Sequence, residues 1–260
     1  MRHAKRQQLA QHAAQERREN KKRSWALISG LAAFCFAAGL AFAGYQLLVH
    51  PDTPLPREWN PTKPLVISDP VTPLTSWKLN RATASFDQCL NTLAGHASVE
   101  PRDPLEETAQ CFISDRVSLA GVGDATLQPL ETRCAIALRM AMWEEHSIQP
   151  AAAAFFGSSV SSIAHIGSYN CRPIRSGSGP SKRMSTHATA DAIDISGFDL
   201  ADGTRVRLRA DWGGVGAKAG FLRAVRDGAC DWFDLTLSPD YNILHADHFH
   251  LQSRGWGLCR

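Results

Sequence analysis

Two short segments of the chain are unusually rich in side chains that bind metal ions. Residues 185–194 contain His187 and Asp194, and residues 245–250 end in His248-Phe249-His250. Zinc is bound by imidazole nitrogens and carboxylate oxygens at about 2.0–2.2 Å, and a catalytic zinc site keeps one position for water. Two histidines and one aspartate drawn from these segments therefore predict an open zinc site.

The spacing within both segments suits strands. Residues 191–198 alternate in polarity, which places Asp194 on one side of a strand and Ile193 and Ile195 on the other. His248 and His250 are two residues apart and share a face if residues 248–252 form a strand. One of these two histidines could then hold the metal while the other faces the bound water or the substrate.

The elements that would position these residues follow from periodicity and turn signals. We expect helices over residues 86–93, 128–145 and 217–233, and strands over 162–171, 191–198, 204–208 and 248–252. This mixture predicts an α+β fold, in which a small antiparallel sheet is flanked by helices. Glu144 and Glu145 end the second helix and are expected on a solvated face rather than as an acid–base pair.

The N-terminal region predicts a membrane anchor. Residues 24–50 contain no charged side chain and are long enough to form one transmembrane helix. The preceding tail, residues 1–23, holds eight Lys or Arg residues, which predicts that the tail is cytoplasmic and the rest of the chain is outside. A cleaved signal peptide is the alternative, with Ala41-Phe42-Ala43 as the cleavage site. Either way, the C-terminal part is exported.

The rest of the chain divides into a spacer and a globular domain. Residues 51–75 contain seven prolines and predict a semi-extended linker, followed by a domain over residues 76–260. The tail carries a net charge of +6 and the remainder −3, so the domain lacks the basic surface typical of nucleic-acid-binding proteins. We therefore expect no nucleic-acid partner.

Six cysteines in the exported domain predict three disulfide bonds. Sequence order suggests three pairs among the 15 possible pairings: Cys89 with Cys111, Cys134 with Cys171, and Cys230 with Cys259. None of the cysteines forms a C-x-x-C pair, which argues against a cysteine-based zinc site.

The first metal-binding segment resembles a known motif. His187 and Asp194 are spaced as in the H-x(6)-D motif of the D-Ala-D-Ala carboxypeptidase superfamily, whose usual form is S-x-H-x-x-G-x-A-x-D. Ser185 and Ala192 also match this form, and Ala190 replaces the glycine. The H-x-H sequence at 248–250 resembles the one that closes the zinc site in the murein endopeptidase and hedgehog branches.

A narrower resemblance covers about residues 89–260. Four blocks, at residues 167–172, 185–194, 226–230 and 246–250, together with the cysteines, resemble the bacterial extensin-like C-terminal domain. This resemblance implies that His187, Asp194 and His250 bind one zinc ion. It also implies a single-pass protein of the bacterial inner membrane whose C-terminal domain lies in the periplasm.

The resemblance implies catalytic roles for several other residues. Either His248, at the H-x-H base position, or Asp247, at the carboxylate position of another branch, would be the general base. Arg172 or Arg175 would stabilise the oxyanion.

Three further residues are expected beside the substrate: Tyr169, Ser185 and His245, of which His245 could also orient the base. The implied activity is zinc-dependent hydrolysis of peptide bonds in peptidoglycan. Two alternatives are a non-catalytic envelope-binding or structural module that keeps its zinc, and a disulfide-held scaffold without metal.

Overall fold

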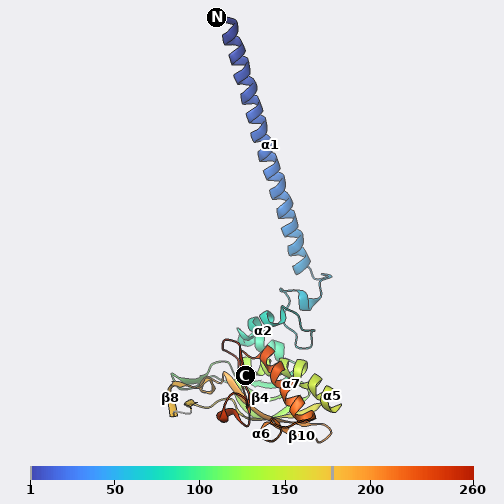
Figure 1. The fold of residues 1–260 in the computed structure, drawn as a ribbon, viewed down its shortest axis with the longest axis vertical. Coiled ribbons are helices and arrows are strands. Elements are labelled where there is room, and N and C mark those ends of the chain that lie inside the picture. Colours follow the sequence, from blue (N-terminus) through green and yellow to red (C-terminus); the bar gives the residue numbers. More distant parts are fainter. Residues whose placement is uncertain (1, 177–178) are drawn as a thin grey trace. The chain divides into compact units, whose positions relative to one another are not determined.

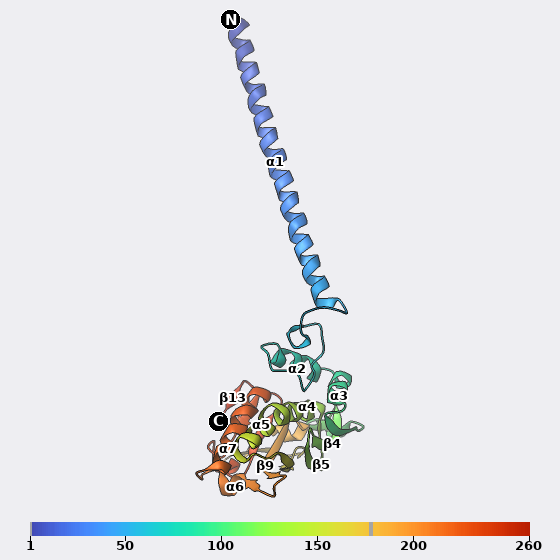
Figure 2. The same ribbon diagram turned by 90° about the vertical axis from the view of Figure 1, so that its right-hand side faces the viewer.

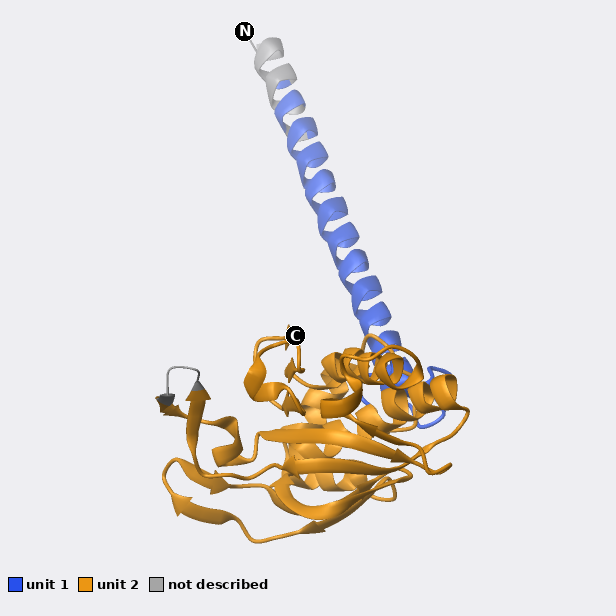
Figure 3. Ribbon diagram, turned by 60° about the horizontal axis from the view of Figure 1, so that its bottom comes forward, with its two compact units in different colours: residues 1–62 blue, residues 63–260 orange. Residues whose placement is uncertain are grey.

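The computed structural model describes residues 2–176 and 179–260, which form two compact units divided between residues 62 and 63 (Figure 3). The first unit contains helix α1 (Arg2–Val49) and the 3-10 turn η1 (Arg57–Trp59). Within α1, Ala14–Val49 is long and apolar enough to cross a membrane, and its large apolar side chains are exposed. The predicted apolar helix is thus confirmed, and its composition suits either a membrane span or a signal sequence.

Helix α4 (Cys134–Trp143) is the central helix of the second unit, and nearly all of its residues are buried. The Trp143 ring packs edge-on against Phe198 and Phe233, and its indole N–H donates to the carbonyl of Val225 at 2.8 Å. Helices α4, α5 and α7 lie together in Figure 2. The other helical elements are α2 (Thr75–Thr83), α3 (Phe86–Leu93), the π-helical turn η2 (Glu144–Ile148), α5 (Gln149–Phe156), α6 (Leu208–Asp211) and α7 (Ala217–Trp232).

The main sheet of the second unit is mixed and has nine strands among the described residues. Its order is β1 (Ala97–Pro101), β4 (Arg116–Val122), β5 (Ala125–Arg133), β6 (Val160–Gly167), β9 (Ala192–Leu200), β12 (Phe249–Gln252), β11 (Leu235–Leu237) and β13 (Leu258–Cys259), with β10 (Arg205–Arg207) paired to β9. Two pairs, β5–β6 and β11–β13, are parallel, and the others are antiparallel. The α+β class is confirmed, but the sheet is larger than predicted and not wholly antiparallel.

Two small hairpins stand outside this sheet. One pairs β2 (Leu105–Thr108) with β3 (Cys111–Ile113), and the other pairs β7 (Pro173–Ser176) with β8 (Gly179–Met184). The β7–β8 hairpin projects from the body of the second unit (Figures 1 and 3). The 3-10 turns η3 (Thr186–Thr189) and η4 (Ile243–His245) precede β9 and β12.

The predicted helix over residues 128–145 is wrong in its first six residues, which belong to strand β5. The β4–β5 pairing shifts its register between Leu119 and Gly121, and Pro129 lies in the irregular part of β5. This irregularity leaves Leu127 and Leu130 both buried although they are three residues apart. Since three-residue spacing is typical of a helix face, a bulged strand gives a helical pattern in the sequence.

Glu144 also differs from its prediction, because it is buried rather than solvated. Its carboxylate accepts hydrogen bonds from the backbone N–H of Asp124 at 3.2 Å and from Gln149 Nε2 at 2.7 Å. Burial raises the pKa of Glu144 above its usual value, and these two hydrogen bonds oppose the shift. Glu145 is exposed, as expected.

Two of the three disulfide pairs suggested by sequence order are wrong. Cys89 bonds to Cys134 and Cys111 bonds to Cys171, while the predicted Cys230–Cys259 bond is confirmed. Helix α3, which carries Cys89, packs against α4 rather than against β3. Pairing in sequence order therefore fails because the contacts that decide it are made between elements distant in the chain.

The second half of the proline-rich segment belongs to the second unit. Leu65 and Ile67 are buried in its hydrophobic core. The Ile67 carbonyl also lies 2.7 Å from Nε2 of His146, whose ring stacks on Trp232. Residues 63–74 therefore pack as part of the domain.

Candidate metal centre

Two of the three predicted metal ligands lie on adjacent strands. Asp194 on β9 and His250 on β12 are direct partners in the antiparallel register. Their neighbours in sequence, such as Ile193 and Phe249, are buried in the core on the opposite face. His187 lies in η3, the turn that precedes β9. The alternating pattern in the sequence thus places apolar side chains in the core and the ligands on the other face.

The three side chains converge on one point. His187 Nε2 lies 3.2 Å from His250 Nδ1 and 3.2 Å from Asp194 Oδ2, and His250 Nδ1 lies 2.8 Å from Asp194 Oδ1. All three are buried, with exposed fractions of 3% for His187 and 8% for each of the others. The lone pairs of these ring nitrogens and carboxylate oxygens repel one another at such separations unless a proton or a cation lies between them.

The two distances of 3.2 Å fit a metal ion of the size of zinc, and the distance of 2.8 Å between His250 and Asp194 is shorter. Tetrahedral bonds of about 2.0–2.1 Å hold neighbouring donor atoms roughly 3.3 Å apart. The three donors together form a group that could hold such an ion. Two imidazoles and one carboxylate suit zinc, although other divalent transition metals accept the same donors.

The backbone fixes the ring of His187 in a metal-binding state. Its Nδ1 donates to the carbonyl of Ser168 at 2.6 Å, so Nε2 of the neutral ring carries the free lone pair. Ser168 is itself held by its hydroxyl, which donates to the carbonyl of Ala192 at 2.6 Å and lies 2.7 Å from the hydroxyl of Thr132. This support from Ser168 was not predicted from the residue pattern.

His250 is oriented by Gln252, which follows it by two residues on β12. The side-chain nitrogen of Gln252 lies 2.6 Å from His250 Nε2. The two ends of an amide have nearly the same shape, and a half-turn places the Gln252 oxygen there to accept an N–H from Nε2. That arrangement leaves the lone pair of His250 on Nδ1, which faces Asp194. Period-two spacing after His250 is the signal that could have identified Gln252.

The electrostatics of the ligand group favour a charged carboxylate on Asp194 and a neutral imidazole on His250. Burial would raise the pKa of Asp194, but its close contacts with the rings of His187 and His250 hold this pKa well below its usual range. Burial lowers the pKa of His250 in spite of its contact with Asp194. Burial, followed by the nearby charges of His250 and His248, also lowers the pKa of His245 to about 4.

His248 and Asp247 occupy different places relative to the ligands. Nε2 of His248 lies 3.7 Å from Asp194 Oδ1, so this atom faces the ligand group. Its other nitrogen, Nδ1, lies 2.9 Å from the Asp247 carboxylate, which is about half exposed. The ring of His245 lies 5.3 Å from that of His248, and its Nδ1 is 2.8 Å from Asn242 Oδ1.

The remaining predicted residues lie at varying distances from the centre. Arg172 is half-buried; burial and the nearby charge of Arg175 lower its pKa, whereas the charge of Asp194 raises it. The hydroxyl of Ser185 accepts from the backbone N–H of His187 at 3.3 Å and so caps η3. Burial and the neighbouring Glu107 raise the pKa of Tyr169. Contact of Tyr169 and Ser185 with substrate stays a prediction.

Asp191 is a further residue that holds the site together. Its buried carboxylate pairs with Arg133 at 2.6 Å and with Arg254 at 2.8 Å. Its backbone N–H donates to Thr186 in η3, and its carbonyl accepts from the N–H of Ser253, just after β12. Asp191 therefore links the turn that carries His187 to the strand that carries His250.

Ala190, at the position of the glycine in the resembled motif, has φ of 50° and ψ of 28°. No other non-glycine residue in the described parts of the chain has a positive φ. Its N–H donates to the carbonyl of His187 at 3.1 Å, which closes the turn. The alanine therefore adopts the left-handed conformation that glycine adopts most easily.

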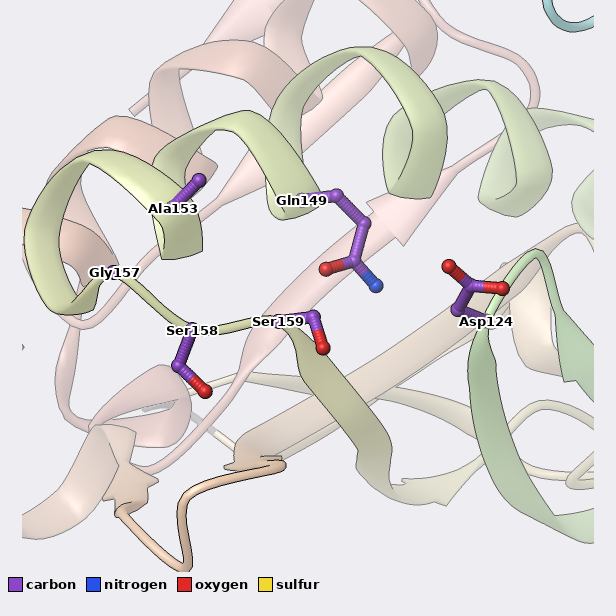
Figure 4. A pocket seen from close by; sticks show the side chains of 6 residues that line it. All are labelled: Asp124, Gln149, Ala153, Gly157, Ser158 and Ser159. Atoms are coloured by element: carbon purple, nitrogen blue, oxygen red, sulfur yellow. The ribbon is translucent and has the colours of Figure 1, made fainter.

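A separate hollow of about 510 Å³ lies at the start of β6, and its lining does not include the ligand group. Gln149 in this hollow is already bonded to Glu144 and to both backbone groups of Val160. Few of its polar groups thus remain for a ligand. It is lined by Asp124, Gln149, Ala153, Gly157, Ser158 and Ser159 (Figure 4).

Comparison with known protein families gives a match over most of the second unit. Residues 87–260 match a family profile described as the C-terminus of extensin-like proteins. No curated protein and no solved structure matches the chain. The match covers every residue of the ligand group and all six disulfide-bonded cysteines.

Proposed function

The chain belongs to the family of extensin-like protein C-termini, and on that premise we propose that it is a zinc-dependent peptidase of the bacterial cell envelope. Its substrate would be the peptides of peptidoglycan. The observation that carries this proposal is the convergence of His187, Asp194 and His250 beside the ring of His248. Three protein ligands and a nearby proton acceptor are the arrangement of hydrolytic zinc sites.

A zinc ion bound there would lower the pKa of its water ligand and polarise the peptide carbonyl. The ligands themselves are held rigidly, because two lie on paired strands and the third is fixed through Ser168. Such support keeps a site ready for its reaction without rearrangement.

We assign the general base to His248 rather than to Asp247. His248 Nε2 faces the ligand group and can accept a proton there, whereas the Asp247 carboxylate contacts the other ring nitrogen, Nδ1. The Asp247 carboxylate would accept the N–H of His248 Nδ1 and so keep Nε2 unprotonated and correctly oriented. Arg172 would stabilise the oxyanion, since a guanidinium stays protonated and donates several hydrogen bonds.

The proposed location follows from the N-terminal helix and the disulfides. Three disulfide bonds are typical of a domain outside the cytoplasm. The apolar part of α1 would anchor the chain in the inner membrane, with the domain in the periplasm. A cleaved signal sequence remains the alternative for α1.

One observation favours a second function, a non-catalytic envelope-binding module that retains its zinc. His248 Nε2 is 3.7 Å from Asp194 Oδ1, so a small shift could make it a fourth ligand. Four protein ligands would close the site to water, as in structural zinc centres.

Digestion of purified peptidoglycan tests the proposal. The full-length chain, solubilised in detergent and supplied with zinc, is compared with His187→Ala, His248→Ala and the control His96→Ala, and the muropeptides are analysed. We expect the wild type and the control to release the same new products, and the other two variants to release almost none. Identical products from all four proteins would contradict a peptidase. Loss of zinc from His248→Ala would indicate the closed, structural site.

A further inference from the structure

We propose that the β7–β8 hairpin is an anion-binding arm of the metal site, which holds a substrate or ligand that carries several carboxylates. The inference rests on the proposed function only in treating this ligand as the substrate. It depends on the charge of the hairpin and on the way in which the hairpin is joined to the ligand group.

The hairpin region contains basic side chains but no acidic ones. Residues 171–190 contain four Lys or Arg residues and no Asp or Glu: Arg172, Arg175, Lys182 and Arg183. Arg172 is half-buried and the other three are exposed. Among the described residues, no carboxylate forms an ion pair with any of the four.

Many arginines elsewhere in the domain are paired. Arg116, Arg207 and Arg254, for example, lie 2.5, 2.6 and 2.8 Å from carboxylate oxygens. Like charges gathered on and beside one short hairpin repel one another, and burial together with the charge of Arg175 lowers the pKa of Arg172. An anionic ligand would relieve this repulsion, and guanidinium groups bind carboxylates with two parallel hydrogen bonds.

The base of the hairpin is continuous with the metal centre. The N–H of Ser185 donates to the carbonyl of Arg172 at 3.0 Å, and the N–H of Asn170 donates to that of His187 at 3.0 Å. The Cys111–Cys171 disulfide bond fixes the same end of the hairpin. A ligand bound along the hairpin would therefore extend to the metal centre.

The spacing of the basic residues indicates that the ligand carries more than one carboxylate. Arg172 directly precedes β7 and Arg175 lies within it, and since an extended chain advances by about 3.3 Å per residue, the two residues are at most roughly 10 Å apart. Arg183 and Lys182 lie on the returning strand β8. An acidic peptide with carboxylates at intervals of several ångströms would match these positive charges.

Binding of a labelled deca-glutamate peptide tests the inference, with deca-glutamine as the uncharged probe. The zinc-loaded full-length chain is used in detergent, with the Lys and Arg residues of the tail (1–23) replaced by glutamine so that the tail cannot bind the probe. The hairpin variant carries Arg175→Gln, Lys182→Gln and Arg183→Gln. The control variant loses the same charge on β10, α6 and α7, through Arg205→Gln, Arg209→Gln and Lys218→Gln.

We expect deca-glutamate, but not deca-glutamine, to bind with an affinity that falls as salt is added. The hairpin variant should bind at least about tenfold more weakly and the control variant within about threefold of the parent. Equal weakening in both variants would show that net charge alone acts, and absence of binding by the parent would also overturn the inference. Zinc content should stay unchanged in both variants. Failure of peptidoglycan digestion with intact deca-glutamate binding would reject the peptidase and leave the anion-binding arm.

Discussion

His250 and Asp194 face each other across strands β12 and β9, and His250 Nδ1 lies 2.8 Å from Asp194 Oδ1. The pairing of two backbone strands, rather than the arrangement of a loop, thus sets the distance between two of the three candidate ligands. His187 joins them from a turn, and its position depends on Ser168 and on the turn closed by Ala190.

Replacement of Gln252 should weaken metal binding without removing a ligand. In Gln252→Leu, His250 Nε2 loses its partner, and the ring is no longer held with its Nδ1 lone pair toward Asp194. Loss of such a supporting hydrogen bond typically costs about 10- to 100-fold in metal affinity. Competition with a chromophoric chelator measures the zinc affinity. Gln252→Glu, which keeps an acceptor for the Nε2–H, should bind zinc more tightly than the leucine variant, and equal affinities would reject this role.

His248 and Asp247 should differ in the size of their effects on turnover. His248→Ala removes the proposed base and should lower kcat by about 10²- to 10⁴-fold, while zinc content remains stoichiometric. Asp247→Asn leaves the ring in place and should have a smaller effect, since Asp247 only orients His248. Rates of release of muropeptides, with zinc measured in the same samples, provide the comparison. A larger loss in Asp247→Asn than in His248→Ala would make Asp247 the base.

Glycine should be tolerated at position 190 but not at position 188. Both alanines are buried, but only Ala190 has a positive φ. A left-handed non-glycine residue costs about 1 kcal/mol or more, so relief of this strain in Ala190→Gly should offset the lost methyl group. Ala188→Gly gains no such relief and should lose about 1 kcal/mol.

Valine at position 190 should destabilise the domain by roughly 2–4 kcal/mol, because a β-branched side chain fits neither the backbone conformation nor the packed space. Urea unfolding measures all three variants. Equal losses for glycine at both positions would show that strain at Ala190 does not matter.

The disulfide pairing predicts which cysteine variants are equivalent. Cys111→Ser and Cys171→Ser should each remove the same bond and lower the free energy of unfolding by about 2–4 kcal/mol. The double variant should be no less stable than either single variant. Mass spectrometry of non-reduced peptides should find Cys89 joined to Cys134. A peptide joining Cys89 to Cys111 would contradict this fold of the domain.

Glu144 should make stability depend on pH. Its pKa in the folded state is raised by burial, so the folded chain keeps this proton at a pH where the unfolded chain has lost it. The stabilisation is therefore full below the unfolded pKa of about 4.3 and is lost as the pH rises through the folded value. Each unit of difference corresponds to about 1.4 kcal/mol.

Unfolding by urea at several pH values between about 4 and 7 would reveal this dependence. The wild type should lose stability relative to Glu144→Gln as the pH rises, since glutamine does not titrate. Glu145→Gln is the control, because Glu145 is exposed and should leave the pH dependence unchanged. Parallel curves for the wild type and Glu144→Gln would reject the effect.

The sequence by itself determined the features that depend on residue type and short spacing. Alternation around Asp194 and the period of two from His248 to His250 identified the face that carries the ligands, because side chains of a strand alternate between its two faces. Composition alone likewise predicted the apolar N-terminal helix and a domain held by three disulfides, both of which the structure contains.

The tertiary structure decided what depends on contacts between distant segments. The pairing of Cys89 with Cys134, the burial of Glu144 and the strand at Leu127 to Leu130 all arise where elements far apart in the chain pack together. The roles that His248 and Asp247 could take also depend on a contact between distant segments, because His248 lies just before β12 and its Nε2 is 3.7 Å from Asp194 Oδ1 on β9. Local periodicity predicts the face of a strand on which a side chain lies. Which side chains of other segments it meets there depends on long-range strand pairing.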